Sequence, residues 1–255
     1  MTGATPHEVD DRDFSFAFQP IIDTRTRTAY SHEALVRGLN NEGAFQVINR
    51  YTVQQMAAFD AACRAKAIAV AVGIGLRTHL NLNFLPSAAA DAEVGLNSTI
   101  EAARRNAFPL HRIIVEATEG AVINDHAKFA RLVNEYRRVG IGLAIDDFGA
   151  GYSGLNLLAE FQPDIVKIDM GLVRGIESHG PRQAIARAII QLCLDLGIDV
   201  VAEGVETVEE FSWFSNQGVS FFQGYLFAKP SFEALPPFHI PDVISSGIFP
   251  GALAR

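Results

Sequence analysis

Seven polar side chains in this 255-residue chain lie at the ends of short apolar runs, and their types suit metal-assisted chemistry. They are five carboxylates, one amide and one amine: Glu33, Asn83, Glu116, Asp146, Asp147, Lys167 and Glu203. Carboxylates gathered in one cleft would repel one another, and a pair of divalent cations would offset that repulsion. Oxygen ligands without His or Cys favour Mg²⁺ or Mn²⁺ over zinc. Two such ions commonly serve in-line attack on phosphorus.

The adjacent pair Asp146 and Asp147 is unusual because successive residues of a strand point to opposite faces. Both carboxylates can reach one site only where the strand breaks, and Gly149 and Gly151 are expected to supply that break. One carboxylate could then bridge two metal ions while its neighbour completes the second site. Lys167 could orient the attacking water or neutralise a phosphate.

Short apolar runs that alternate with amphipathic stretches must position these side chains. Eight runs predict strands, at residues 16–22, 28–36, 79–85, 112–118, 141–147, 164–170, 198–204 and 220–227. Helices are expected at 49–72, 126–139, 182–196 and 208–217. This order predicts an α/β fold, a single (β/α)₈ TIM-like barrel whose active-site face gathers the carboxyl ends of the strands. The short turn after the first run predicts one antiparallel strand near the start.

The same reading divides the chain into three parts. Residues 1–13 are expected to be an N-terminal extension, 14–236 the single domain, and 237–255 a C-terminal tail rich in Pro, Gly and Ser.

Composition and charge exclude several classes of function. The net charge is −8 and the 21 Lys and Arg are scattered, so a nucleic-acid polymer is not expected as a partner. Cys63 and Cys193 lie far apart and indicate neither a disulfide framework nor a zinc site. The acidic N-terminus lacks the apolar core of a signal peptide, and the most apolar run is half of the ~20 residues that a membrane span needs. We therefore expect a cytoplasmic protein that does not insert into membranes.

Taken singly, several of these residues have a purely structural interpretation. Glu33 could be a surface carboxylate at a strand end. Asn83 could form a turn, and Asn81 is its rival as a ligand because both lie on the same strand face. Glu206 is expected to be a helix-start acid.

The pair Asp146–Asp147 could also cap a helix, although capping needs only one of them. The following "GAGYSG" imitates a dinucleotide-binding turn, but two aspartates in front of it would repel a pyrophosphate.

Eight motifs together resemble one known family. They are "FQPI", "HEALVRG", "NFLPSA", "VEATE", "DDFGAGYSGL", "PDIVKID", "AEGVE" and "QGYLFAKP", in order along residues 14–236. The chain is similar to the EAL-domain phosphodiesterases, which hydrolyse the bacterial second messenger cyclic di-GMP to linear pGpG. The sequence departs from the usual "ELTE" and "DDFGTGYSS" patterns of that family, but no expected metal ligand is lost.

The resemblance implies a role for each matching position. The implied catalytic residues are Glu33, Lys167 and Glu203. The implied ligands of two Mg²⁺ or Mn²⁺ ions are Glu33, Asn83, Glu116, Asp146, Asp147 and Glu203. The implied substrate-binding residues are Gln19, Leu35, Arg37, Asp169, Gln223 and Pro230. Glu119 resembles the residue that steadies the loop from Asp147 to Ser153.

The resemblance also implies partners. A homodimer is expected, and a regulatory protein partner could supply the signal. The alternative function is a catalytically silent module of this family that binds cyclic di-GMP or a protein.

Overall fold

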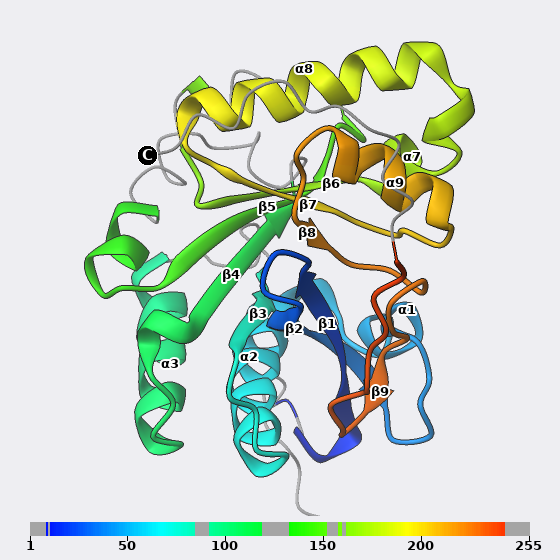
Figure 1. Cartoon of the computed structure of the whole chain (residues 1–255). Coiled ribbons are helices and arrows are strands. Elements are labelled where there is room, and N and C mark those ends of the chain that lie inside the picture. Colours follow the sequence, from blue (N-terminus) through cyan, green and yellow to red (C-terminus); the bar gives the residue numbers. More distant parts are fainter. Residues whose placement is uncertain are drawn as a thin grey trace, which may run out of the picture.

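The structure is a computed structural model that describes residues 9, 11–84, 92–118, 133–151, 158–159 and 162–242. Its centre is a closed barrel of eight strands, with helices packed outside it (Figure 1). The barrel strands are β1 (Phe14–Asp23), β2 (Thr28–Gly38), β3 (His79–Asn83), β4 (Ile113–Thr118), β5 (Gly142–Phe148), β6 (Ile165–Ile168), β7 (Asp199–Ala202) and β8 (Phe221–Phe222).

The pairing of the strands confirms the expected α/β barrel with one antiparallel strand near its start. Strands β2 to β8 pair in sequence order, each parallel to the next. Strand β1 closes the barrel between β8 and β2 and is antiparallel to both. A ninth strand that the sequence did not predict, β9 (Ser231–Phe232), adds to β1.

The described helices are α1 (Ala44–Ile48), α2 (Met56–Gly73), α3 (Ala92–Arg105), α7 (Met170–Val173), α8 (Gly180–Leu196) and α9 (Val208–Asn216). Short 3₁₀ turns lie at Asp11–Asp13, Val53–Gln55, Leu110–Arg112 and Ile176–Ser178. The helix expected from residue 49 begins at Met56 instead. Thr52 and Gln55 close a capping turn there, with the Thr52 amide donating to the Gln55 side chain at 3.0 Å. The helix expected at 126–139 is described only from residue 133.

The barrel interior is layered, and this layering positions the polar residues. A small apolar cluster of inward-facing residues fills the lower part: Ile21, Ile114, Ala144, Ile165, Val201 and Phe221. Side chains two residues apart on a strand share a face. The residues two positions from this cluster, toward the carboxyl ends of the parallel strands, therefore also face inward, and they are polar. They are Gln19 on the antiparallel β1, Glu116, Asp146, Lys167, Glu203 and Gln223.

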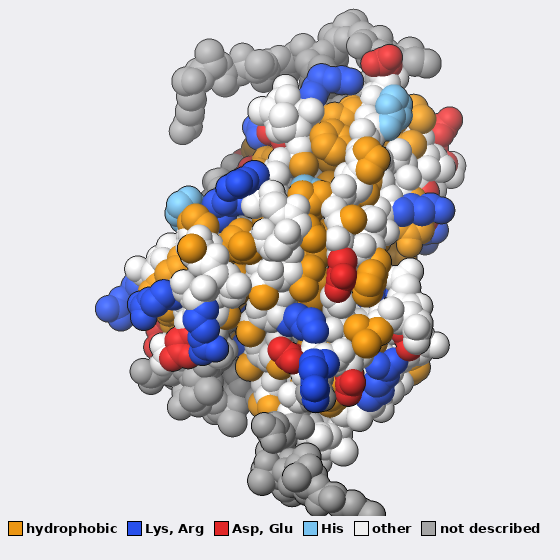
Figure 2. Space-filling model, turned by 90° about the horizontal axis from the view of Figure 1, so that it is seen from below, with side chains coloured by type: hydrophobic (Ala, Val, Ile, Leu, Met, Phe, Trp, Pro, Cys, Tyr) orange, Lys and Arg blue, Asp and Glu red, His pale blue; other side chains and the backbone are white. Residues whose placement is uncertain are grey.

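None of the described helices is long and apolar enough to cross a membrane. Figure 2 shows basic side chains spread over one face among acidic and apolar ones, rather than gathered in a single patch.

Candidate active site

Lys167 is the centre of the polar layer. Its ammonium nitrogen lies 2.5 Å from Glu203, 2.9 Å from Glu116, 3.1 Å from Asp146 and 3.4 Å from Glu33. The lysine is 1% exposed, so burial alone would lower its pKa, but the four carboxylates raise that pKa well above its usual value. Lys167 is therefore a fixed positive charge that holds four carboxylates from four strands or strand ends together.

Glu33, on β2, is held by hydrogen bonds from two amides besides Lys167. Its carboxylate accepts from Gln223 Nε2 at 2.7 Å and from Asn83 Nδ2 at 3.1 Å. Gln223 Nε2 also lies 3.3 Å from Gln19 Oε1, and Gln19 donates to the carbonyl oxygen of Ala228 at 3.1 Å. The expected residues Gln19, Glu33, Asn83 and Gln223 thus form one connected network across the barrel mouth.

The strand break that brings both aspartates to the site lies at Asp147. This residue has φ of +55°, in the left-handed region that Asp tolerates better than most residues. The ladder between β5 and β6 shifts its register between Ile145 and Phe148 at the same point. The strand ends as expected at Gly149, because β5 stops at Phe148 and Gly149 has φ of +95°, but the backbone already turns at Asp147, two residues earlier.

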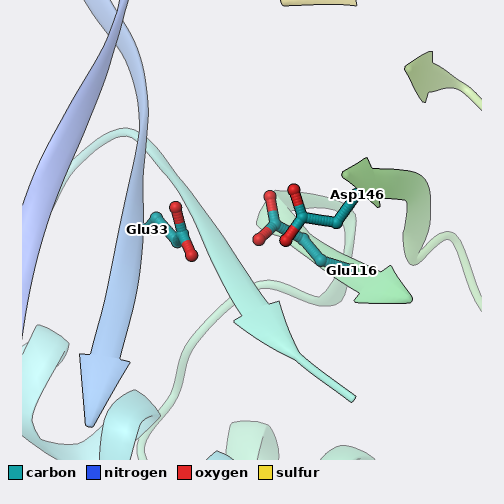
Figure 3. A group of neighbouring side chains, drawn as sticks. All are labelled: Glu33, Glu116 and Asp146. Carbon is teal, nitrogen blue, oxygen red and sulfur yellow. The ribbon is translucent and has the colours of Figure 1, made fainter. Parts of the chain in front are cut away.

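Two groups of carboxylates could each hold a cation, and they share Asp146. One group is Glu33, Glu116 and Asp146, and the other is Asp146, Asp147 and Glu203; ligand atoms in each lie within 4.8 Å of one another. Figure 3 shows the first three carboxylates converging from their separate elements toward a common centre.

Buried oxygen atoms at this centre fit a hard cation. Among the described residues, Glu116 Oε2 and Asn81 Oδ1 are buried without a hydrogen-bond partner. A buried acceptor without a donor is costly, and a bound cation would satisfy it. Asn81 also donates to Glu116 Oε1 at 2.7 Å, whereas the exposed Asn83 contacts Glu33. Both asparagines are thus close to expected metal ligands, and the rivalry between them stands.

The surroundings of the carboxyl groups give them different pKa values. Burial raises the pKa of Glu203 well above its usual value and that of Glu116 to about 8, despite the opposing effect of Lys167. Burial and the neighbouring Asp146 also raise the pKa of Asp147. Burial acts in the same direction on Asp146, but Lys167 outweighs it and lowers the pKa of that residue. Carboxyls with unlike proton affinities in one cleft are typical of acid–base sites.

Two cavities flank Glu33. One, of about 260 Å³, is mainly apolar and lies among β2, β3, α1 and α2. Its apolar lining includes Phe16, Leu35, Ile48, Phe59, Cys63 and Leu82. The other, of about 250 Å³, is more polar and opens over β6, β7 and β8. Its lining includes Gln19, Asp147, Met170, Arg174, Glu203, Glu206, Gln223 and Tyr225.

The remaining expected residues occupy the rim. Leu35 lines the apolar cavity. Arg37 is half-buried and donates to the carbonyl oxygen of Val36 at 2.8 Å, and Asp169 accepts from the Gly171 amide as the N-cap of α7. Pro230 is half-buried next to β9. Glu119 lies outside the described residues, as do Tyr152 and Ser153 of the loop that it is expected to steady.

Sequence reasoning missed Met170, Arg174 and Tyr225, and it assigned Glu206 only to a helix start. All four line the polar cavity. Each lies within a few residues of an expected site residue and follows a strand end, which places it at the same mouth of the barrel. That proximity is the signal that could have found them.

The structure is a (β/α)₈ barrel with a buried acidic centre at the carboxyl ends of its strands, which is the face where enzymes of this fold class have their active sites. Within that class, residues 3–230 match the model of the EAL domain, and the chain belongs to this family.

Two curated relatives illustrate its range. The blue light- and temperature-regulated antirepressor BluF of Escherichia coli K12 is 36% identical over 230 residues, which is 89% of this chain and 57% of that protein. The cyclic di-GMP phosphodiesterase PA2567 of Pseudomonas aeruginosa PAO1 is 29% identical over 224 residues, which is 85% of this chain and 38% of that protein. The chain therefore spans about half the length of these relatives or less.

Two solved structures are also similar. A standalone EAL protein from Vibrio cholerae O395, in its c-di-GMP-bound form, is 49% identical with a TM-score of 0.85, covering 89% of this chain and 96% of that one. BlrP1 of Klebsiella pneumoniae, in a complex with manganese and cyclic di-GMP, is 35% identical with a TM-score of 0.84, covering 91% of this chain and 60% of that one.

Proposed function

We propose that the chain hydrolyses cyclic di-GMP to linear pGpG by in-line attack of water on one phosphodiester. The observation that carries this proposal is that two clusters of three carboxylates each could hold a cation and share Asp146. Two Mg²⁺ or Mn²⁺ ions held there would neutralise phosphate charge and lower the pKa of the attacking water. Their ligands would be Glu33, Asn83, Glu116, Asp146, Asp147 and Glu203. A manganese complex of a family member with cyclic di-GMP supports this choice of ion.

The protein's own residues then handle the proton. The water oxygen bonds to phosphorus as the bond from phosphorus to the 3′ oxygen breaks, and the 3′ oxygen leaves and takes up a proton from solvent. Glu203 accepts the proton of the attacking water, because Lys167 fixes its carboxylate at 2.5 Å beside the shared ligand Asp146. Lys167 contacts the water and keeps its charge throughout.

The two cavities beside Glu33 suit a ligand with two arms. Cyclic di-GMP carries one nucleoside on each side of the cleaved phosphate, so each base would enter one cavity. Leu35 would contact the base in the apolar cavity, and Gln19 and Gln223 would contact the ligand near Glu33. Arg37, Asp169 and Pro230 would bind at the rim.

A second function is favoured by one relative. The name of BluF describes an antirepressor, so a member of this family can work by binding. A silent module would bind cyclic di-GMP or a protein without turnover. We favour the enzyme because two clusters of carboxylates that could hold cations lie beside the cavities.

The setting of the activity is part of the proposal. Because cyclic di-GMP is an intracellular messenger of bacteria, we propose the cytoplasm as the location. We propose residues 14–236 as the catalytic unit, working as a homodimer, with Glu119 steadying the loop from Asp147 to Ser153 and a protein partner as the source of regulation.

The test is chromatography of cyclic di-GMP incubated with purified protein and Mg²⁺ or Mn²⁺. Glu33→Ala should abolish the appearance of pGpG, whereas Glu209→Ala, an exposed acid in the first turn of α9, should leave it unchanged. Cyclic di-GMP that is bound but not cleaved by the wild type would identify a silent module. Equal loss in both variants would show that the site is misplaced.

A further inference from the structure

A third cavity lies at the end of the barrel opposite the carboxylates. It has a volume of about 300 Å³, and four strands each place their first or second residue on its wall: His79, Ile114, Gly142 and Ile165. The apolar layer that includes Ile114 and Ile165 separates it from the polar layer. Enzymes of this fold class have their active sites at the other end of the barrel, so the proposed hydrolysis leaves this cavity without a role.

Gly142 keeps this cavity open. It lies two residues before Ala144 on β5, so it occupies an inward-facing position. Its φ is outside the left-handed region, so the backbone does not require glycine there. A Cβ atom at this position would make only ordinary contacts, at 3.4 Å from Ile114 Cγ1 and 3.8 Å from Asp164 Oδ2. Glycine inside a strand costs stability and often marks a place where a ligand approaches closely.

Two stacked rings form one wall of the cavity. The ring centroids of Tyr30 and His79 are 4.8 Å apart with 28° between the planes, and both residues are half-buried. His79 Nδ1 lies 3.2 Å from the carbonyl oxygen of Tyr30, and the Phe221 ring supports Tyr30 at a centroid distance of 4.8 Å. Because these contacts fix both rings, the wall is a rigid aromatic surface against which a flat ligand can pack.

Arg137 and His111 bring positive charge to the cavity. Both are exposed, and both line it. Arg137 donates to the carbonyl oxygen of Gln162, and its guanidinium has further N–H groups that can bind an anion. Burial lowers the pKa of His79, and the charges of Arg112 and His111 lower it further, which indicates a positive potential at the His79 ring.

Asp164 brings the opposite charge to the same cavity. Its Oδ2 accepts from the Leu143 amide at 2.8 Å, which fixes the carboxylate at the cavity wall. Burial raises the pKa of Tyr30, and the charges of Asp199 and Asp164 raise it further. A ligand that suits all of these groups must therefore combine an anion for Arg137 with N–H donors for Asp164 and a flat ring.

We propose that this cavity binds a purine nucleoside monophosphate, independently of the carboxylate centre and its metal ions. The base packs against Tyr30 and His79 with its N–H groups toward Asp164, and the phosphate contacts Arg137 and His111. Inorganic phosphate leaves the aromatic wall and Asp164 unused, and an uncharged nucleoside leaves Arg137 unused. Both parts of the ligand are therefore needed for full affinity.

Calorimetric titration with GMP in EDTA tests the site without bound metal or turnover. The wild type should bind GMP about tenfold more tightly than inorganic phosphate or guanosine, and Arg137→Gln should weaken GMP binding about tenfold, the effect of one hydrogen bond between charged groups. Arg138→Gln changes the exposed next residue, which does not line the cavity, and should keep the wild-type affinity. The inference would be overturned if the wild type did not bind GMP, if phosphate bound equally well, or if Arg137→Gln kept the wild-type affinity.

Gly142→Ala tests the shape of the cavity separately from its charge. The added methyl group projects into the cavity, so GMP binding should fall about tenfold. Urea unfolding should show a fold at least as stable as the wild type, because alanine suits a strand better than glycine. Gly73→Ala, at the end of α2 with open space around it, is the matched control. GMP binding that is unchanged in Gly142→Ala but displaced by cyclic di-GMP would place GMP at the carboxylate centre and refute a separate site.

Discussion

Lys167 on β6 lies 3.1 Å from Asp146 on the neighbouring strand β5, and this contact keeps the pKa of Asp146 low although burial acts to raise it. The lysine is 1% exposed. Removing the cation from such a pair leaves the carboxylate without a compensating charge, which costs more stability than removing both charges.

Lys167→Met should therefore destabilise the fold by about 3–5 kcal/mol and abolish turnover. Denaturant unfolding in EDTA measures the loss. The double variant Lys167→Met/Asp146→Asn should recover part of the stability but none of the activity, because the uncharged amide no longer needs a cation beside it. Additive losses in the double variant would mean that the two side chains do not act as a pair.

Asp146 belongs to both carboxylate clusters, so its loss should weaken cation binding more than the loss of a carboxylate that belongs to one cluster. Mn²⁺ at about 100 times its dissociation constant should stabilise the wild type by about 2.7 kcal/mol per site. Asp146→Asn alters both carboxylate groups and should lose most of this stabilisation. Glu116→Gln and Asp147→Asn each alter one group and should keep part of it. Thermal unfolding with Mn²⁺ or EDTA measures the difference, and a wild-type shift in Asp146→Asn would refute the shared-ligand arrangement.

Strand periodicity explains why most of the polar layer could be predicted. Glu116, Lys167 and Glu203 each lie two residues after an inward apolar residue on a regular strand, so the alternation of the sequence already fixes their direction. The short strand β9 could not be predicted in this way. Its two residues carry no periodic pattern, and only tertiary contact with β1 orders them.

Irregular backbone explains the errors at the site. Glycine is the strongest sequence signal for a left-handed residue, and it indicated Gly149, where the strand ends, but not the left-handed Asp147 before it. The loop residues Arg174 and Tyr225 follow no periodic pattern either. Their place at the cavity depends on hydrogen bonds between loops far apart in sequence, such as the one from Gly175 to Glu210.

The conformation of Asp147 makes its own prediction. Asp147→Gly and Asp147→Ala both remove the carboxylate, but only glycine adopts φ of +55° without strain. In EDTA, the glycine variant should be more stable than the alanine variant by about 1 kcal/mol. Denaturant unfolding compares the two directly, and each should lose turnover equally because neither supplies the ligand. Equal stability would show that the strand end relaxes out of the left-handed conformation.

His32, next to Glu33 on β2, should make the fold sensitive to acid. Its ring is 5% exposed, and burial lowers its pKa from 6.5 to about 4. Between these values the unfolded chain binds a proton that the folded chain does not, so the stability contribution is complete above pH 6.5 and is lost as the pH falls toward 4.

The loss between about pH 7 and pH 5 should be roughly 2 kcal/mol larger in the wild type than in a variant without this histidine. His32→Asn is suitable because a short amide can keep the hydrogen bond to Thr78 Oγ1, which is 2.8 Å from the ring Nδ1. Urea unfolding at both pH values gives the difference, and His111→Asn, at an exposed position, is the matched control. If His32→Asn lost as much stability as the wild type, the acid sensitivity would lie in the buried carboxylates. That result is not expected, because their raised pKa values make protonation favour the folded state.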